Sequence, residues 1–440
     1  MKLIGNALNQ CITLKLRYAM KKDTFQQNII TYLSSFVVLF LILSSCANQT
    51  KTKSSEKNRM NPDYKKGQYG FDLQFLSSHL KPVELINGES RILVVPEYQG
   101  RVMTSTSSGL NGFSYGWINH GLIDEGAVHP HINAYGGEER LWFGPEGGQF
   151  SIFFKEDDPF DTDHWQTPAC IDTEAFEIYN QDSGSVAFTK NILLSNYSGS
   201  KFNFNVFREV RLLNRENLMK NLSIEIPKSV KVVAYRSNNR IKNIGNNEWE
   251  KSTGTISIWM LGMLNPSPEV IVVIPYKKGD YGAIVNSDYF GEVPKERLQI
   301  SDGVIFFKAD GKYRSKIGVS ALRALPLIGS YDAKNKILTV LECTIDESAK
   351  EYVNSAWEIQ KDPFAGDVIN SYNDGPMEDG SQMGPFYELE SSSKAAFLKP
   401  GEELSHSQVT YHFEGDEGEL NLISEKILGV SIREVKKSFD

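Results

Sequence analysis

Residues 131–150, HINAYGGEERLWFGPEGGQF, combine side chains that can bind a hydroxylated ring. If the middle of this segment is a short strand, Arg140 and Trp142 share one face of it. Leu141 and Phe143 then take the other face. A guanidinium offers a fork of donors to ring hydroxyls, and an indole stacks on the C–H face of a sugar. The segment is therefore predicted to form one wall of a sugar site.

The carboxylates of this segment allow a second interpretation. Glu139 and Glu146 lie close to Arg140 in the sequence, and either could hold its guanidinium in a structural ion pair. Both roles are compatible, so Glu139 and Glu146 join Arg140 and Trp142 as candidate substrate-binding residues. The glycine pairs at 136–137 and 147–148 indicate that the ends of the strand need backbone freedom or a close approach.

A second group of candidates lies in GPFYELE at residues 384–390. In a strand, Glu388 and Glu390 lie on one face. Two like charges that close raise at least one pKa, as a general acid or base requires, whereas on an exposed face the pair is solvated and inert. We expect this pair to face the same hollow as Arg140 and Trp142.

Two further segments carry polar side chains with a functional and a structural interpretation. Four aspartates within Asp157–Asp163 could supply oxygen ligands to Ca²⁺, but the segment lacks the glycine and the terminal Glu of an EF-hand loop, so a solvated acidic turn is favoured. Asn239 could donate amide hydrogen bonds to a ligand, or it could serve a turn.

The elements that must position these residues are mostly strands. Short apolar or alternating runs bounded by turn residues predict strands at 91–95, 201–206, 255–260, 270–274, 304–308, 337–342 and 408–413. Helical patterns are scarce, and the best are Ser348–Gln360 and the stretch from Asn421. The predicted fold class is all-β, a large antiparallel sandwich with few short helices.

The first 60 residues indicate targeting. Residues 20–46 are interpreted as a lipoprotein signal peptide that ends in the lipobox Leu43-Ser44-Ser45-Cys46. Residues 1–19 have no role in such a signal peptide and are interpreted as a misassigned start. Cys46 is the expected lipidation site, and a transmembrane anchor is the alternative. Residues 47–60 read as a flexible tether, and 61–440 as one domain. The expected location is the cell envelope, in the outer membrane, with the membrane reached only through the lipid.

Composition excludes some partners. The formal net charge of -8 argues against nucleic acid, which requires clustered Lys and Arg. Without Cys11 and Cys46, only Cys170 and Cys343 remain, so disulfides cannot form the framework of the fold. A single disulfide and two buried thiols are both open.

Three segments resemble galactose mutarotase-like domains. VVPEYQGRV at 94–102 looks like their N-terminal strand and turn, and RLWFGPEG at 140–147 resembles a motif of uncharacterised bacterial lipoproteins of that superfamily. The sequence Glu388-Leu389-Glu390, followed by LKPGE at 398–402 and a closing strand at 406–413, is similar to the end of aldose 1-epimerases. The order of these motifs along the chain is the order found in the family.

The resemblance implies a β-supersandwich whose concave face holds a sugar. It implies that Glu390, or else Glu388, is the base of an epimerase-type reaction, and the first motif adds Arg101 to the candidate binding residues. The family's histidine acid has no counterpart at Ser237–Arg240, so His131 is the candidate acid. Without an acid, a rate factor of roughly 10² to 10⁴ is lost.

His406 and His412 are alternative acids, and each histidine could equally be a hydrogen-bonded residue of the cleft or the sheet. The expectation is thus a carbohydrate-binding lipoprotein without a cofactor. Its enzymatic form would be an aldose 1-epimerase-like isomerase or another carbohydrate-active enzyme. Non-catalytic glycan binding and a structural envelope module are the alternatives.

Overall fold

The computed structural model describes residues 64–377 and 379–440, which belong to one compact unit, Met60–Asp440. The predictions for residues 1–19, the signal peptide with Cys46, and the tether lie outside the described residues. Within those residues, no helix has the length and apolar character needed to span a bilayer.

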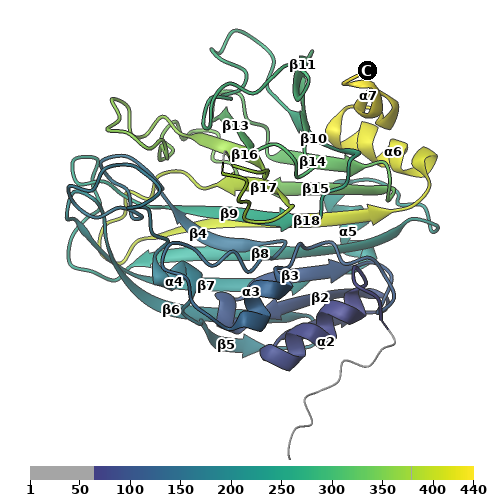
Figure 1. Cartoon of the computed structure of the whole chain (residues 1–440), viewed down its shortest axis with the longest axis horizontal. Helices are drawn as coiled ribbons and strands as arrows, with labels where there is room; N and C mark the ends of the chain where they lie inside the picture. The colour runs from purple at the N-terminus through teal and green to yellow at the C-terminus, as the bar shows by residue number, and fades with distance from the viewer. Residues whose placement is uncertain (1–63, 378) are drawn as a thin grey trace, which may run out of the picture. The chain divides into compact units, whose positions relative to one another are not determined.

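The strands form three antiparallel sheets (Figure 1). The three-stranded sheet contains β1 Val83–Asn87, β2 Ser90–Val95 and β3 Arg101–Thr106, in that order. The five-stranded sheet has the order β13-β16-β17-β9-β4, with bounds β4 Arg140–Gly144, β9 Ser257–Leu264, β13 Ser315–Ser320, β16 Asp367–Asn373 and β17 Tyr387–Ser392.

The ten-stranded sheet has the order β11-β12-β10-β14-β15-β18-β8-β7-β6-β5. Its bounds are β5 Glu177–Gln181, β6 Ser185–Ser195, β7 Lys201–Leu212, β8 Lys231–Asn243, β10 Val270–Pro275, β11 Leu298–Ser301, β12 Val304–Lys308, β14 Leu327–Asp332, β15 Ile337–Cys343 and β18 Glu403–Glu414. Every strand predicted from the sequence is present, and the predicted all-β fold class is confirmed.

The helices are short and few. They are α2 Tyr69–His79, α3 His120–Glu125, α4 Ala169–Asp172, α5 Arg215–Leu222, α6 Glu417–Leu428 and α7 Ile432–Lys437, with a 3₁₀ turn η1 at Pro96–Tyr98. The helical pattern from Asn421 is confirmed by α6 and α7, which pack beside β10 (Figure 1). The predicted helix over Ser348–Gln360 is wrong, because backbone groups there bond to other segments, as in Tyr352 N–H to Phe364 C=O at 3.0 Å.

The core lies between the five- and ten-stranded sheets. Strand β4 turns Phe143 towards the large sheet, where its ring meets Phe204 of β7 edge-on at 5.2 Å. Strand β17 turns Tyr387 the same way, and its hydroxyl lies 2.9 Å from Ser330 of β14. Because side chains alternate along a strand, Arg140 and Glu388 point to the opposite, front face of the five-stranded sheet.

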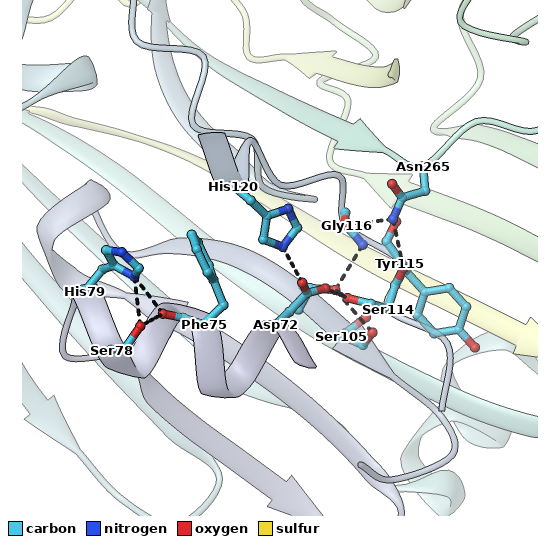
Figure 2. A network of polar contacts seen from close by, with 11 residues as sticks. Asp72, Phe75, Ser78, His79, Ser105, Ser114, Tyr115, Gly116, His120 and Asn265 are labelled. Carbon is cyan, nitrogen blue, oxygen red and sulfur yellow. Dashed lines mark hydrogen bonds and ion pairs between the residues drawn. The ribbon is translucent and has the colours of Figure 1, made fainter. Parts of the chain in front are cut away.

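Helix α2 is held to the domain by a buried aspartate (Figure 2). Asp72 accepts hydrogen bonds from Ser114 and from His120, the latter at 2.7 Å. The Phe75 ring lies between His79 and His120, with centroids at 4.5 and 4.7 Å. Since the serine and the histidine both bond the carboxylate and not each other, this cluster lacks the serine–histidine bond of a nucleophilic triad and acts as an attachment.

Candidate functional site

Strand pairing aligns the two predicted segments across the front face. In the five-stranded sheet β9 lies between β4 and β17, and both Arg140 and Glu390 are paired with Leu261. Trp142 is paired with Trp259 of β9. Directly opposed residues point to the same side of a sheet, so these side chains share the front face with Glu388.

Arg140 and Glu388, 248 positions apart, form a buried ion pair. The Arg140 guanidinium also lies 4.9 Å from the Trp142 ring centroid, and that ring meets Trp259 edge-on at 5.8 Å. Arg140 therefore pairs with neither Glu139 nor Glu146, the partners considered from the sequence. The structure brings the cation and the indole of one segment to the acids of the other.

Glu390 is held through one of its two oxygens. Its Oε2 accepts hydrogen bonds from Trp259 Nε1 at 2.9 Å and from Lys316 Nζ at 3.0 Å. Its Oε1 is buried and has no hydrogen-bond partner among the described residues, and the same is true of Arg140 Nε and Trp142 Nε1. A buried donor or acceptor without a partner costs about 1 to 3 kcal/mol of folding free energy. A water molecule or a ligand that bonds these atoms would remove this cost.

The charges on this face shift one another's pKa. Burial raises the pKa of Glu388 to about 8; Arg140 opposes the rise, and the negative charge of Glu390 adds to it. Burial lowers the pKa of Lys316, but the carboxylates of Glu390 and Glu146 outweigh this effect and raise it. The raised pKa of Glu388 favours its protonated form and Arg140 favours its charged form, while the raised pKa of Lys316 favours its cation beside Glu390.

Glu146 lies at the edge of the same cluster. Burial raises its pKa to about 6, against the opposing charge of Lys316 and with support from the charge of Glu390. Its backbone N–H donates to the Ser355 hydroxyl at 3.1 Å. Gly147 makes this turn possible, because a Cβ there would lie 2.3 Å from the Ala356 carbonyl oxygen.

A small cavity adjoins Lys316 and Trp259. Its volume is about 60 Å³, and Tyr289, Asp367 and Asn370 line it among others. The Tyr289 hydroxyl donates to Asp367 at 2.5 Å and accepts from Asn370 Nδ2 at 3.2 Å. This space holds a few water molecules or a few hydroxyl groups, but not a pyranose ring.

Glu139 and Asn239 lie on the opposite face, between the sheets. Arg208 of β7 donates to Glu139 Oε1 at 2.8 Å and to Asn239 Oδ1 at 2.7 Å, and all three side chains are buried. Gln408 Nε2 donates to the other oxygen of Glu139 at 3.0 Å. These two candidate binding residues thus belong to an inter-sheet network and not to the front face.

Arg101 begins strand β3, and His131 lies in the segment that precedes β4. Arg101 is buried, donates to the Gly136 carbonyl at 2.9 Å and to Gln99 Oε1 at 3.0 Å, and its pKa is lowered to about 9 by burial and by repulsion from Arg140. His131 is half-buried, and its Nδ1 lies 2.7 Å from the Trp165 carbonyl. Among the described residues, His131 has no hydrogen bond to Glu388 or Glu390.

The other histidines considered as acids are buried between the sheets. His406 bonds Ser391 through Nε2 at 2.8 Å, and His412 bonds Thr339 through Nδ1 at 2.9 Å. The His412 ring also stacks on Tyr115, with centroids 4.2 Å apart. Both are hydrogen-bonded residues of the sandwich interior.

The acidic turn shows local hydrogen bonding. Asp161 accepts from the backbone of Asp163 and His164 and from the His164 ring, and Asp158 accepts from Lys155 N–H. Across residues 64–377 and 379–440, no group of three or more His, Cys, Asp or Glu side chains is placed to hold a metal ion. Cys170 and Cys343 are both buried free thiols. Of the two possibilities that the sequence leaves open, the structure therefore has two thiols and no disulfide between them.

Three residues of the front face were missed from the sequence: Trp259, Tyr289 and Lys316. Trp259 lies in a predicted strand. Its pairing with Trp142 of β4 places it on this face, but that pairing cannot be derived from the sequence pattern. Lys316 lies 4.8 Å from the Trp259 ring and 5.7 Å from the Tyr289 ring, contacts that join separate segments. No local pattern marks such a residue.

Comparison with known proteins assigns the family. The sequence pattern of DUF6786, a family of unknown function, matches residues 67–439, so the chain belongs to that family. No curated protein matches its sequence.

Solved structures similar to this chain include galactose mutarotase-like proteins, as its motifs predict. The galactose mutarotase-like protein of Lactobacillus casei is 9% identical, with 76% of this chain and 99% of that chain covered and a TM-score of 0.42. The galactose mutarotase related enzyme of Lactobacillus acidophilus is 10% identical over 76% and 99%, with a TM-score of 0.43. The Slr1438 protein of Synechocystis is 12% identical over 77% and 96%, with a TM-score of 0.47.

Proposed function

We propose that the front face of the five-stranded sheet binds a carbohydrate and supports acid–base chemistry at its anomeric centre. The observation that carries this proposal is the combination of groups on one face: two indoles, two acids two residues apart, two cations, and buried polar atoms without partners. An indole surface suits the C–H face of a sugar ring, and the acids and cations suit its hydroxyl groups.

Glu390 is the proposed base. Lys316 and Trp259 both donate hydrogen bonds to its Oε2, and these two bonds fix the orientation of the carboxylate. Its Oε1 has no partner among the described residues. A carboxylate oxygen in this state can take the proton of an anomeric hydroxyl.

Glu388 is the proposed acid, in place of a histidine. Its raised pKa keeps a proton available near neutral pH for the ring oxygen. Trp142 and Trp259 supply the stacking surfaces, and Arg140, once Glu388 is neutral, can turn donors to sugar hydroxyls.

Glu390→Gln tests the catalytic part of the proposal. The amide cannot accept the anomeric proton, so we expect mutarotation of freshly dissolved D-glucose or D-galactose, followed by polarimetry, to slow by about 10²-fold or more. Glu347→Gln, an exposed glutamate, is the matched control and should keep the wild-type rate. Wild-type protein that does not accelerate either sugar above the buffer rate would reject this activity.

Non-catalytic glycan binding is the second candidate, and the ion pair between Arg140 and Glu388 favours it, because a carboxylate locked to a guanidinium cannot donate a proton. In that case calorimetry detects sugar binding that Trp142→Ala and Arg140→Ala weaken, while polarimetry shows no acceleration. If calorimetry detects no sugar binding and polarimetry no acceleration, a structural module of the cell envelope would be the remaining function.

The proposed location is the cell envelope, with a lipid on Cys46, which lies outside the described residues. The lipobox that ends at Cys46 supports this. Metabolic labelling with an alkyne palmitate should mark the wild-type chain and not Cys46→Ala. Equal labelling of both chains would refute the anchor.

A further inference from the structure

The segment between β10 and β11 covers the front face at the β13 edge. Asn286 of this segment pairs with Gly318 of β13 through two backbone bonds of 2.8 Å. Three residues further on, Tyr289 is turned inward, towards Lys316 and Asp367. The next residue, Phe290, is 44% exposed. The segment thus presents one aromatic side chain to the cavity and the following one to solvent.

Phe290 is exposed but held in place. The Arg314 guanidinium lies 3.9 Å from its ring centroid, and the Tyr372 ring meets it edge-on at 5.9 Å and 75°. No ion pair of Arg314 occurs among the described residues. The Arg314 side chain also interacts with the Tyr372 hydroxyl. A guanidinium that stacks on a ring can still donate its remaining in-plane N–H groups to hydroxyl acceptors. Phe290 and Arg314 therefore offer an apolar ring and several donors at one place.

This pair is continuous with the proposed site. Tyr372 of β16 lies opposite Glu388 of β17 in the strand register, so a single side chain separates Phe290 from the proposed acid. The Tyr372 hydroxyl is fixed by a 2.6 Å bond to Asp374. Unlike the inner cavity, the Phe290 ring is accessible in the structure as it stands.

We propose that Phe290 and Arg314 form a second saccharide subsite, and that the ligand is a glycan chain of at least two units and not a free monosaccharide. This inference rests on the proposed function, since the inner unit occupies the Glu388–Glu390 site. The next unit stacks on Phe290 and receives hydrogen bonds from Arg314. An aromatic ring at the mouth of a sugar site adds affinity only for a ligand long enough to reach it.

An array of neutral mono- to hexasaccharides, followed by calorimetry on the ligands that bind, tests the subsite. We expect wild-type protein to bind oligosaccharides about tenfold or more tightly than the matching monosaccharide. Phe290→Ala should lose most of that gain and leave monosaccharide affinity unchanged. Arg314→Ala is a second variant with the same expected pattern, in case one change disturbs the segment. Tyr179→Ala, which removes an aromatic side chain that is 70% exposed on β5, should bind as wild type does.

The outcomes separate this inference from the proposed function. Equal affinity for one unit and for several, or full oligosaccharide affinity in both Phe290→Ala and Arg314→Ala, overturns the subsite while the inner site stands. A loss of affinity for monosaccharide and oligosaccharide alike assigns both residues to the inner site and also overturns it. Failure of every saccharide on the array to bind rejects the inner site and the subsite together.

Discussion

At the scale of single residues, the buried side chain of Arg140 has a different partner from those that its sequence neighbours suggest. From the sequence it is either a sugar donor or half of an ion pair with a nearby glutamate, and the structure pairs it with Glu388 from a different strand. A buried ion pair adds little net stability, because desolvation offsets the attraction, but breaking one costs 3–5 kcal/mol. The pair is therefore better explained by what it does to Glu388 than by stability.

Removing Arg140 should have a pH-dependent cost. Because burial raises the pKa of Glu388 to about 8, the wild-type acid is protonated at pH 6 and ionised at pH 9. Arg140→Met should thus destabilise by about 1 kcal/mol at pH 6 and by about 3 kcal/mol or more at pH 9, where a buried charge loses its partner. Urea denaturation at the two pH values measures both.

Two further variants complete that experiment. Arg140→Met combined with Glu388→Gln should recover most of the loss at pH 9, because no buried charge remains. Lys278→Ala breaks a pair whose side chains are 60% and 86% exposed, and should cost less than about 1 kcal/mol at either pH. A cost for Arg140→Met that does not change with pH would contradict the role given to Glu388.

At the scale of elements, local patterns located strands but not their partners. Alternation in Arg140-Leu141-Trp142-Phe143 correctly assigned the two faces of β4, and the two-residue spacing of Glu388 and Glu390 did the same for β17. The same alternation puts Glu139 on the back face, a signal that was present in the sequence. What alternation cannot give is that β9 separates these strands, since that depends on pairings more than 100 positions apart.

Helices were harder to predict, for two physical reasons. Residues 348–360 have helical spacing, yet their backbone groups bond to residues 363–366 and to the Gln149 side chain, so tertiary contacts override the local preference. Helix α2 has apolar residues on more than one side, which hides its period, and its capping residue Gln68 makes no side-chain cap. Its stability comes from Asp72 and the contacts in Figure 2.

At the scale of the whole unit, the two large sheets are joined by polar as well as apolar contacts. Gln408 of β18 donates to Glu139 and accepts from Ser391, so one amide ties together the backs of β4 and β17. Glu139 precedes Arg140 and Ser391 follows Glu390. The inter-sheet network thus fixes the strands whose front faces carry the candidate site, and His406 is part of it through Ser391.

The pH dependence of unfolding should report this network. Burial alone lowers the pKa of His406 to about 4, from about 6.5 in the unfolded chain. The folded state therefore favours the neutral ring. The contribution of His406 to the free energy of unfolding is complete above pH 6.5 and is lost as the pH falls towards 4. The difference of about 2.5 pKa units corresponds to roughly 3 kcal/mol.

His406→Gln separates this contribution from the titration of other groups. The amide can still bond the Ser391 hydroxyl but takes up no proton, so between pH 7 and pH 4 the variant should lose about 3 kcal/mol less unfolding free energy than the wild type. Guanidinium denaturation at both pH values measures the difference, and the value at pH 7 shows what the substitution itself costs. Equal losses in the two proteins would mean that His406 accepts a proton without separating the sheets, and the network would then not depend on a neutral imidazole.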